Sequence, residues 1–156
     1  MVHFKQVRDL VQWVADYHAH LRGLYQEKAA ANGLGERLKM ALSYVADHEE
    51  SLQSELDQYL TEDSVHKGVL DTWFEEAVDA PEAPLLEQGP DTLQLRSVQD
   101  VLDTTLASHH LLQALFTQRA EHAVASAETE LFNSLANQYE AELRRLVRNM
   151  QRLEDY

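Results

Sequence analysis

The sequence contains no cysteine, which excludes disulfide bonds, thiolate metal sites and a cysteine nucleophile. Turn-forming residues are also scarce: there are 3 prolines and 5 glycines, and all the prolines lie between residues 81 and 90. A chain so poor in these residues cannot readily make the many tight turns of a β-sandwich or β-barrel. We therefore expect an all-α protein.

Basic residues are few as well. Lys and Arg number 13 against 27 Asp and Glu, which gives a net charge of −14 with His neutral. This charge repels nucleic-acid phosphates, so we expect no nucleic-acid binding, although a basic partner stays possible. The sequence has no apolar run of membrane-span length and no N-terminal targeting pattern. A cytoplasmic protein without membrane contact is the resulting prediction.

Four long segments carry apolar residues at alternating spacings of three and four, which is typical of bundle helices. They span about residues 4–31, 36–60, 92–124 and 127–153, and together they predict one domain over residues 1–156. The first segment stops at Asn32-Gly33, a natural left-handed helix end, and the link to the second is short. A short link makes these two helices antiparallel neighbours.

Residues 61–90 interrupt this pattern. Ser64 to Glu76 could form a short amphipathic helix, and the prolines that follow exclude continuous helix. The last long helix is expected to begin near Ser126, a plausible N-cap. The chain thus predicts two helix hairpins joined by a long crossover that carries a short extra helix.

The two halves of the chain also align with each other, which suggests an internal duplication. A set of residues in the first half is repeated 91 residues later by a similar set that contains His109 and Phe116. The first set is at positions 7, 11, 14, 18, 21, 24 and 25. Any two bundle helices can be matched in their apolar residues. The match of His18 with His109, each followed seven residues later by an aromatic residue, is more specific.

Each long helix places one non-aliphatic residue near the middle of its apolar stripe, and these four residues are His18, Glu49, His109 and Tyr139. Glu142 lies one turn beyond Tyr139. A carboxylate in a helical core is costly unless it is paired, hydrogen-bonded or bound to a metal. His and Glu are common ligands of iron, manganese, zinc and copper. These five residues are therefore the candidate metal ligands.

The residues leave three interpretations open. One transition-metal ion could bind among the His and Glu side chains, or Glu49 could accept hydrogen bonds from His18, His109 or Tyr139 in a metal-free network. Haem bound by His18 and His109 is a third possibility. His48 adjoins Glu49 but points about 100° away from it, so an exposed or supporting role is expected for it.

Two segments carry a resemblance to a known family. They are residues 38–50, which contain Val45-Ala46-Asp47-His48-Glu49-Glu50, and residues 132–140, which contain Leu135-Ala136-Asn137-Gln138-Tyr139-Glu140. With Tyr25 and Ala29 in the first helix, they resemble the ferritin-like superfamily, nearest its rubrerythrin-like branch. The resemblance implies an antiparallel four-helix bundle with a long crossover, a core di-iron site and chemistry on oxygen or peroxide.

The resemblance also implies where the ligands would lie. The two single-Glu positions of the family hold His18 and His109 here, the first Glu-x-x-His position keeps Glu49, and the second holds Tyr139 and Glu142. With so few carboxylates, a mononuclear centre fits these residues better than a di-iron centre, and a degenerate site without metal fits equally well.

Two possible functions follow from these interpretations of the sequence. The first is a ferritin-like metalloprotein that binds one ion for redox or metal handling, with iron as the first choice and manganese or zinc as the others. The second is a metal-free bundle that acts as a homodimer or a partner-binding module. No hydrolase elbow, phosphate loop or zinc-protease motif is present, so the sequence assigns no reaction.

Overall fold

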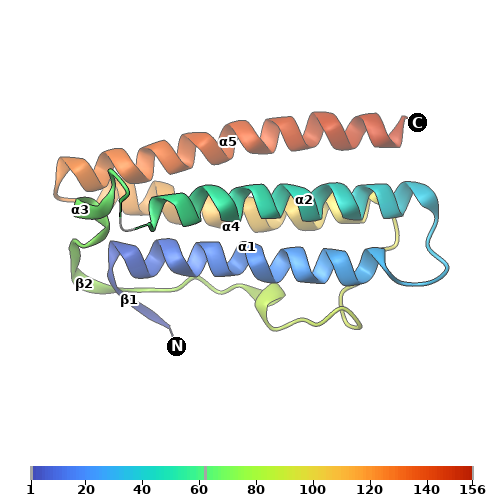
Figure 1. Ribbon diagram of the computed structural model, residues 1–156, viewed down its shortest axis with the longest axis horizontal. Helices are drawn as coiled ribbons and strands as arrows, with labels where there is room; N and C mark the ends of the chain where they lie inside the picture. Colours follow the sequence, from blue (N-terminus) through green and yellow to red (C-terminus); the bar gives the residue numbers. More distant parts are fainter. Residues whose placement is uncertain (1, 62, 156) are drawn as a thin grey trace.

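The computed structural model describes residues 2–61 and 63–155 and is mostly helical, as predicted. Four long helices lie side by side (Figure 1): α1 (Val7–Ala29), α2 (Glu36–Tyr59), α4 (Val98–His122) and α5 (Ser126–Glu154). The shorter elements are β1 (His3–Gln6), α3 (Lys67–Leu70), β2 (Trp73–Asp79) and a 3-10 turn, η1 (Pro84–Leu86). The long helices match the expected segments, except that α4 begins at Val98 and not near residue 92.

The long helices form two antiparallel hairpins, α1 with α2 and α4 with α5 (Figure 1). The segment between α2 and α4 runs back along the length of the bundle beside α1, so α4 starts at the same end as α2 and runs parallel to it. This path requires a connection as long as the helices themselves, which explains why the chain interrupts its helical periodicity for so many residues.

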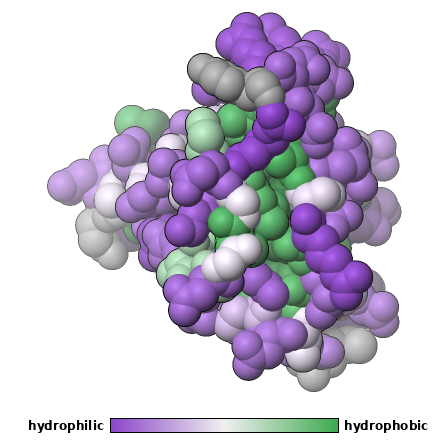
Figure 2. Space-filling model, turned by 90° about the vertical axis from the view of Figure 1, so that its right-hand side faces the viewer, coloured by the Kyte–Doolittle hydropathy of each residue, from purple (hydrophilic) through white to green (hydrophobic). Residues whose placement is uncertain are grey.

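The apolar stripes of all four long helices face inward and form one core. Its largest fully buried side chains include Phe4, Tyr17, Tyr25, Phe116, Phe132 and Tyr139. Viewed from the end at which α5 finishes, the surface shows an apolar band between hydrophilic flanks (Figure 2), so the core reaches the surface at this end. Among the residues that the structure describes, no helix is both long enough and apolar enough to cross a membrane.

Helix ends follow local backbone chemistry. Gly33 has a φ of 83° in the turn after α1, as expected for the Asn32-Gly33 stop. The Ser97 side chain caps α4, because its Oγ accepts a hydrogen bond from the Asp100 amide at 3.0 Å. The predicted N-cap Ser126 is wrong by one residue: Ala125 holds the cap position, and Ser126 is the first residue of α5.

The crossover does carry a short helix, α3, but the predicted span from Ser64 to Glu76 is too long. Only Lys67–Leu70 is helical there, and Trp73–Asp79 is extended and pairs antiparallel with His3–Gln6. The same pairing shows that the first helix begins at Val7 and not near residue 4. A short apolar run is compatible with either a strand or a helix. These two segments are strands because each offers the other unpaired backbone hydrogen-bonding groups.

Candidate metal centre

The structure brings four of the five candidate ligands together in one layer of the core. His18 on α1, Glu49 on α2 and His109 on α4 each have a relative exposure of 0%, and Tyr139 on α5 has 1%. Each lies on the inward stripe of its helix, so the periodicity that buries the apolar residues also points these polar groups at one another.

Glu49 is the centre of this layer. Its Oε2 lies 2.5 Å from Nδ1 of His18, and its Oε1 lies 2.9 Å from Nε2 of His109. Nε2 of His18 lies 2.6 Å from the Tyr139 hydroxyl. One continuous hydrogen-bonded chain therefore runs from α4 through α2 and α1 to α5 and crosses between the two hairpins twice.

Opposing effects set the protonation of this network. Burial raises the pKa of Glu49, but the imidazoles of His109 and His18, which hydrogen-bond to its two oxygens, outweigh this effect and hold the pKa well below its ordinary value. Burial lowers the pKa of His18, and Glu49 offsets only part of that shift. Burial and the Glu49 charge raise the pKa of Tyr139. Near neutral pH, Glu49 is thus ionised, and His18 and the Tyr139 phenol are neutral.

These protonation states fix the hydrogen bonds. A neutral His18 donates its Nδ1–H to Glu49 and accepts the Tyr139 O–H at Nε2. His109 donates from Nε2 to Glu49, and its buried Nδ1 has no hydrogen-bond partner. Both carboxylate oxygens are therefore satisfied, whereas one imidazole nitrogen on the side of α4 is not.

Glu142, the fifth candidate, lies outside this group. Its Oε1 is 3.1 Å from the Arg145 guanidinium, and its Oε2 is 3.8 Å from Nδ1 of His48. Three residues along a helix correspond to a rotation of about 300°, so Glu142 points to the side of the Tyr139 direction and is 14% exposed at its side chain. It acts on the layer from outside, because its charge helps to raise the pKa of Tyr139.

His48 is more involved than the sequence indicates. Its side chain is only 8% exposed, its ring centroid lies 5.2 Å from that of His109, and its Nε2 is buried without a hydrogen-bond partner. Burial and the neighbouring His109 lower the pKa of His48 to about 4. Its position three residues after Val45 was the available sign that it faces inward.

His18, Glu49 and His109 could hold a metal ion. Each offers one ligand atom, and these atoms all lie within 4.8 Å of one another. Within residues 2–61 and 63–155 this is the one group of three or more His, Cys, Asp or Glu residues with that geometry. Two imidazole nitrogens and a carboxylate suit a divalent transition metal, because they match its ligand preference and supply one compensating negative charge.

Comparison with known proteins found no match. No protein-family model matches the chain, and no curated protein or solved structure shows significant similarity to it. The candidate centre therefore depends on its own residues and distances.

Proposed function

We propose that the protein is a ferritin-like bundle that binds one transition-metal ion through His18, Glu49 and His109 and uses it for redox or metal handling. The observation that carries this proposal is the convergence of three fully buried ligand side chains from three helices. The two hairpins and their long crossover support the ferritin-like part of it. Iron is our first choice, and manganese and zinc are the other ions to test.

The protein's own groups would adjust as follows. Nδ1 of His18 and Nε2 of His109 must be free of protons to act as ligands beside the Glu49 carboxylate. In the metal-bound form the proton of the His18 ring would lie on Nε2 instead of Nδ1. This N–H would be donated to the Tyr139 oxygen 2.6 Å away, and the hydrogen bond would fix the orientation of the ring. When bound, a ferrous ion would supply one-electron chemistry, and the dry surroundings would exclude bulk water.

A second candidate function is a metal-free bundle that acts as a homodimer or a partner-binding module. One observation favours it: both oxygens of Glu49 already accept hydrogen bonds, so the network is stable without an ion. A groove of about 930 Å³ between α4 and α5, lined by apolar Leu106, Leu143 and Val147 beside Arg148, offers a surface for such contact.

Metal binding is tested by refolding the protein from urea under anaerobic conditions with ferrous, manganous or zinc salt, because a buried site fills slowly in the folded state. Metal content is then measured after desalting. We expect one ion per chain in the wild type and less than about a tenth of that in Glu49→Gln and His109→Gln.

The chain provides matched controls one residue away. Glu50→Gln and His110→Gln remove the same groups at exposed positions and should keep the ion. Wild-type protein without bound metal after this treatment would contradict the proposal. A metal-free dimer detected by size-exclusion chromatography with light scattering would then favour the second candidate.

A further inference from the structure

A second site lies at the opposite end of the molecule from the one viewed in Figure 2, under an irregularity in the strand pair. Phe4 pairs with Val78 and Gln6 pairs with Trp73, so a single residue of β1 faces residues 74–77 of β2. The extra residues of β2 bulge away from β1, and bulges of this kind redirect side chains and often occur beside functional sites.

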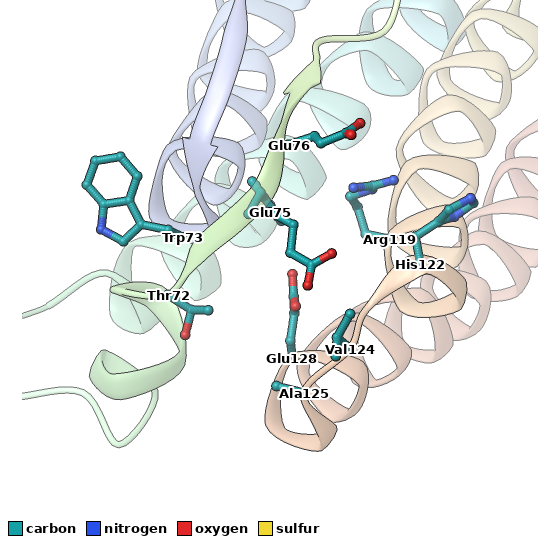
Figure 3. Close-up of a pocket in the computed structure, with 10 residues that line it drawn as sticks. Thr72, Trp73, Glu75, Glu76, Arg119, His122, Val124, Ala125 and Glu128 are labelled. Carbon is teal, nitrogen blue, oxygen red and sulfur yellow. The ribbon is translucent and has the colours of Figure 1, made fainter.

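The bulge forms one wall of a cavity of about 450 Å³. Residues 72–76 line it from β2 and the turn before it, and the end of α4 and the start of α5 line the other side. In Figure 3 the carboxylates of Glu75 and Glu128 point toward each other across the cavity, Arg119 lies beside them on α4, and the side chains of His122 and Trp73 point away from the two carboxylates. Its volume lies in the usual range of small-molecule pockets.

Charged groups of both signs face this cavity without pairing across it. Glu128 is buried, with a relative exposure of 9%, yet it forms no hydrogen bond or ion pair with any residue that the structure describes. Arg119 stacks its guanidinium 5.8 Å from the Phe74 ring centre, and its Nε is buried without a partner. A carboxylate with so little exposure and no hydrogen-bond partner is costly, so Glu128 points to a ligand that completes it.

The remaining polar groups define what the ligand must carry. Burial raises the pKa of Glu128, Arg119 opposes that shift and Glu75 adds to it, as expected for two carboxylates that share a small space. His122 donates its Nδ1–H to the Gln118 carbonyl of its own helix at 2.8 Å. The cavity thus offers acceptors for a cation on one side and a guanidinium for an anion on the other.

We propose that this cavity binds a free α-amino acid with a cationic side chain. The side-chain ammonium group of this ligand would lie between Glu75 and Glu128, and its α-carboxylate would pair with Arg119. The three carboxylates of Glu75, Glu76 and Glu128 outnumber the one guanidinium, which favours a ligand with net positive charge. Phe74 and Val124 provide apolar surface for the methylene groups of the ligand.

Isothermal titration with three related compounds tests the chemistry. L-lysine carries all the groups, norleucine lacks the side-chain cation, and cadaverine lacks the carboxylate. We expect L-lysine to bind at least about tenfold more tightly than either of the others. No binding of L-lysine at 10 mM (roughly the weakest affinity of interest), or equal binding of cadaverine, would overturn the proposal.

Variants assign each group. Arg119→Gln should lower the affinity for L-lysine to that for cadaverine and leave cadaverine unchanged, whereas Glu75→Gln and Glu128→Gln should weaken both by about tenfold. Arg152→Gln and Glu130→Gln remove the same charges from exposed positions of α5 and should have no effect. Glu75 is itself exposed, so its variant keeps the test valid if Glu128→Gln fails to fold. Unchanged L-lysine binding in folded Glu75→Gln and Arg119→Gln would overturn the proposal.

Discussion

The α1–α2 and α4–α5 hairpins present corresponding residues to the same core layer but differ in their chemistry. His18 and His109 occupy equivalent positions, while Glu49 on α2 corresponds to Tyr139 on α5. Glu49 satisfies an imidazole from each hairpin, at 2.5 and 2.9 Å, whereas Tyr139 reaches only His18. One carboxylate therefore supports two imidazoles, and the α4–α5 side is left with an unpaired nitrogen on His109.

The same asymmetry extends outward from the layer. His48 on α2 corresponds to Gln138 on α5, and Tyr25 on α1 corresponds to Phe116 on α4. The α1–α2 hairpin thus holds more of the titratable groups, and the α4–α5 hairpin holds neutral counterparts. Substitutions that exchange these residues test whether the difference between the hairpins determines stability and metal binding.

The largest effect is expected from removing the shared acceptor. Glu49→Leu leaves two buried N–H donors without a partner and should lower the free energy of unfolding by about 3 to 5 kcal/mol. Tyr139→Phe removes one hydrogen bond and should cost about 1 kcal/mol. Urea unfolding of both variants, with exposed Glu50→Leu as control, measures the difference. Equal losses at positions 49 and 139 would show that the two hairpins contribute alike.

The next effect concerns pH. The pKa of His48 is about 4 in the folded protein and 6.5 ordinarily, so between these values the unfolded chain binds the extra proton and stability falls as pH falls. We expect a loss of about 3 kcal/mol from this residue between pH 7 and pH 4. The lowered pKa values of His18 and Glu49 act in the same direction, with Glu49 contributing only below about pH 4.5.

His48→Gln installs the residue of the α4–α5 hairpin and should flatten this part of the profile. Urea unfolding at several pH values measures it, and His110→Gln at an exposed position serves as the control. An unchanged pH dependence in His48→Gln would show that His48 takes up its proton as readily in the folded protein as in the unfolded chain.

A smaller effect, on metal affinity, is expected from giving α5 a carboxylate at the position that corresponds to Glu49 on α2. Tyr139→Glu gives the layer two carboxylates and two imidazoles, which should tighten zinc or cobalt binding by about a hundredfold, equivalent to about 2.7 kcal/mol. Competition with a chromophoric chelator measures the affinity. Without metal the variant should be less stable than the wild type, because two carboxylates then face each other in the core. Unchanged affinity would place the ion away from Tyr139.

The smallest effect concerns a bond between the hairpins. Tyr25 Oη lies 3.0 Å from Thr105 Oγ1, and Tyr25→Phe installs the residue found at position 116. We expect a loss of about 1 kcal/mol, which Thr105→Val should match. The double variant should cost little more than either single change, because both remove the same bond. Additive losses would mean that the two side chains contribute independently.

Periodicity alone predicted most of the fold. Alternating spacings of three and four placed the long helices and identified His18, Glu49, His109 and Tyr139 as inward-facing, because burial in a bundle depends mainly on helical phase. The sequence did not predict the β1–β2 pair, since that depends on two segments about 70 residues apart offering each other backbone hydrogen bonds.

The limits at the candidate centre have a different cause. Glu142 is on the correct helix, but its carboxylate pairs with Arg145, and such pairing depends on side-chain positions that spacing does not determine. His48 was assigned a peripheral position because it is about 100° from Glu49 around the helix, yet in a four-helix bundle that direction meets a neighbouring helix and the His109 ring.

The pairing of β1 with β2 has a practical consequence for work on this protein. The residues that directly precede α1 form β1, which pairs with β2, and the bulge of β2 lines the amino-acid cavity. The last turn of α5 lies at the opposite end of the bundle (Figure 1). An affinity tag or fluorophore fused ahead of residue 3 would extend the strand that pairs with β2. The same group attached after α5 would leave both the cavity and the buried imidazoles undisturbed.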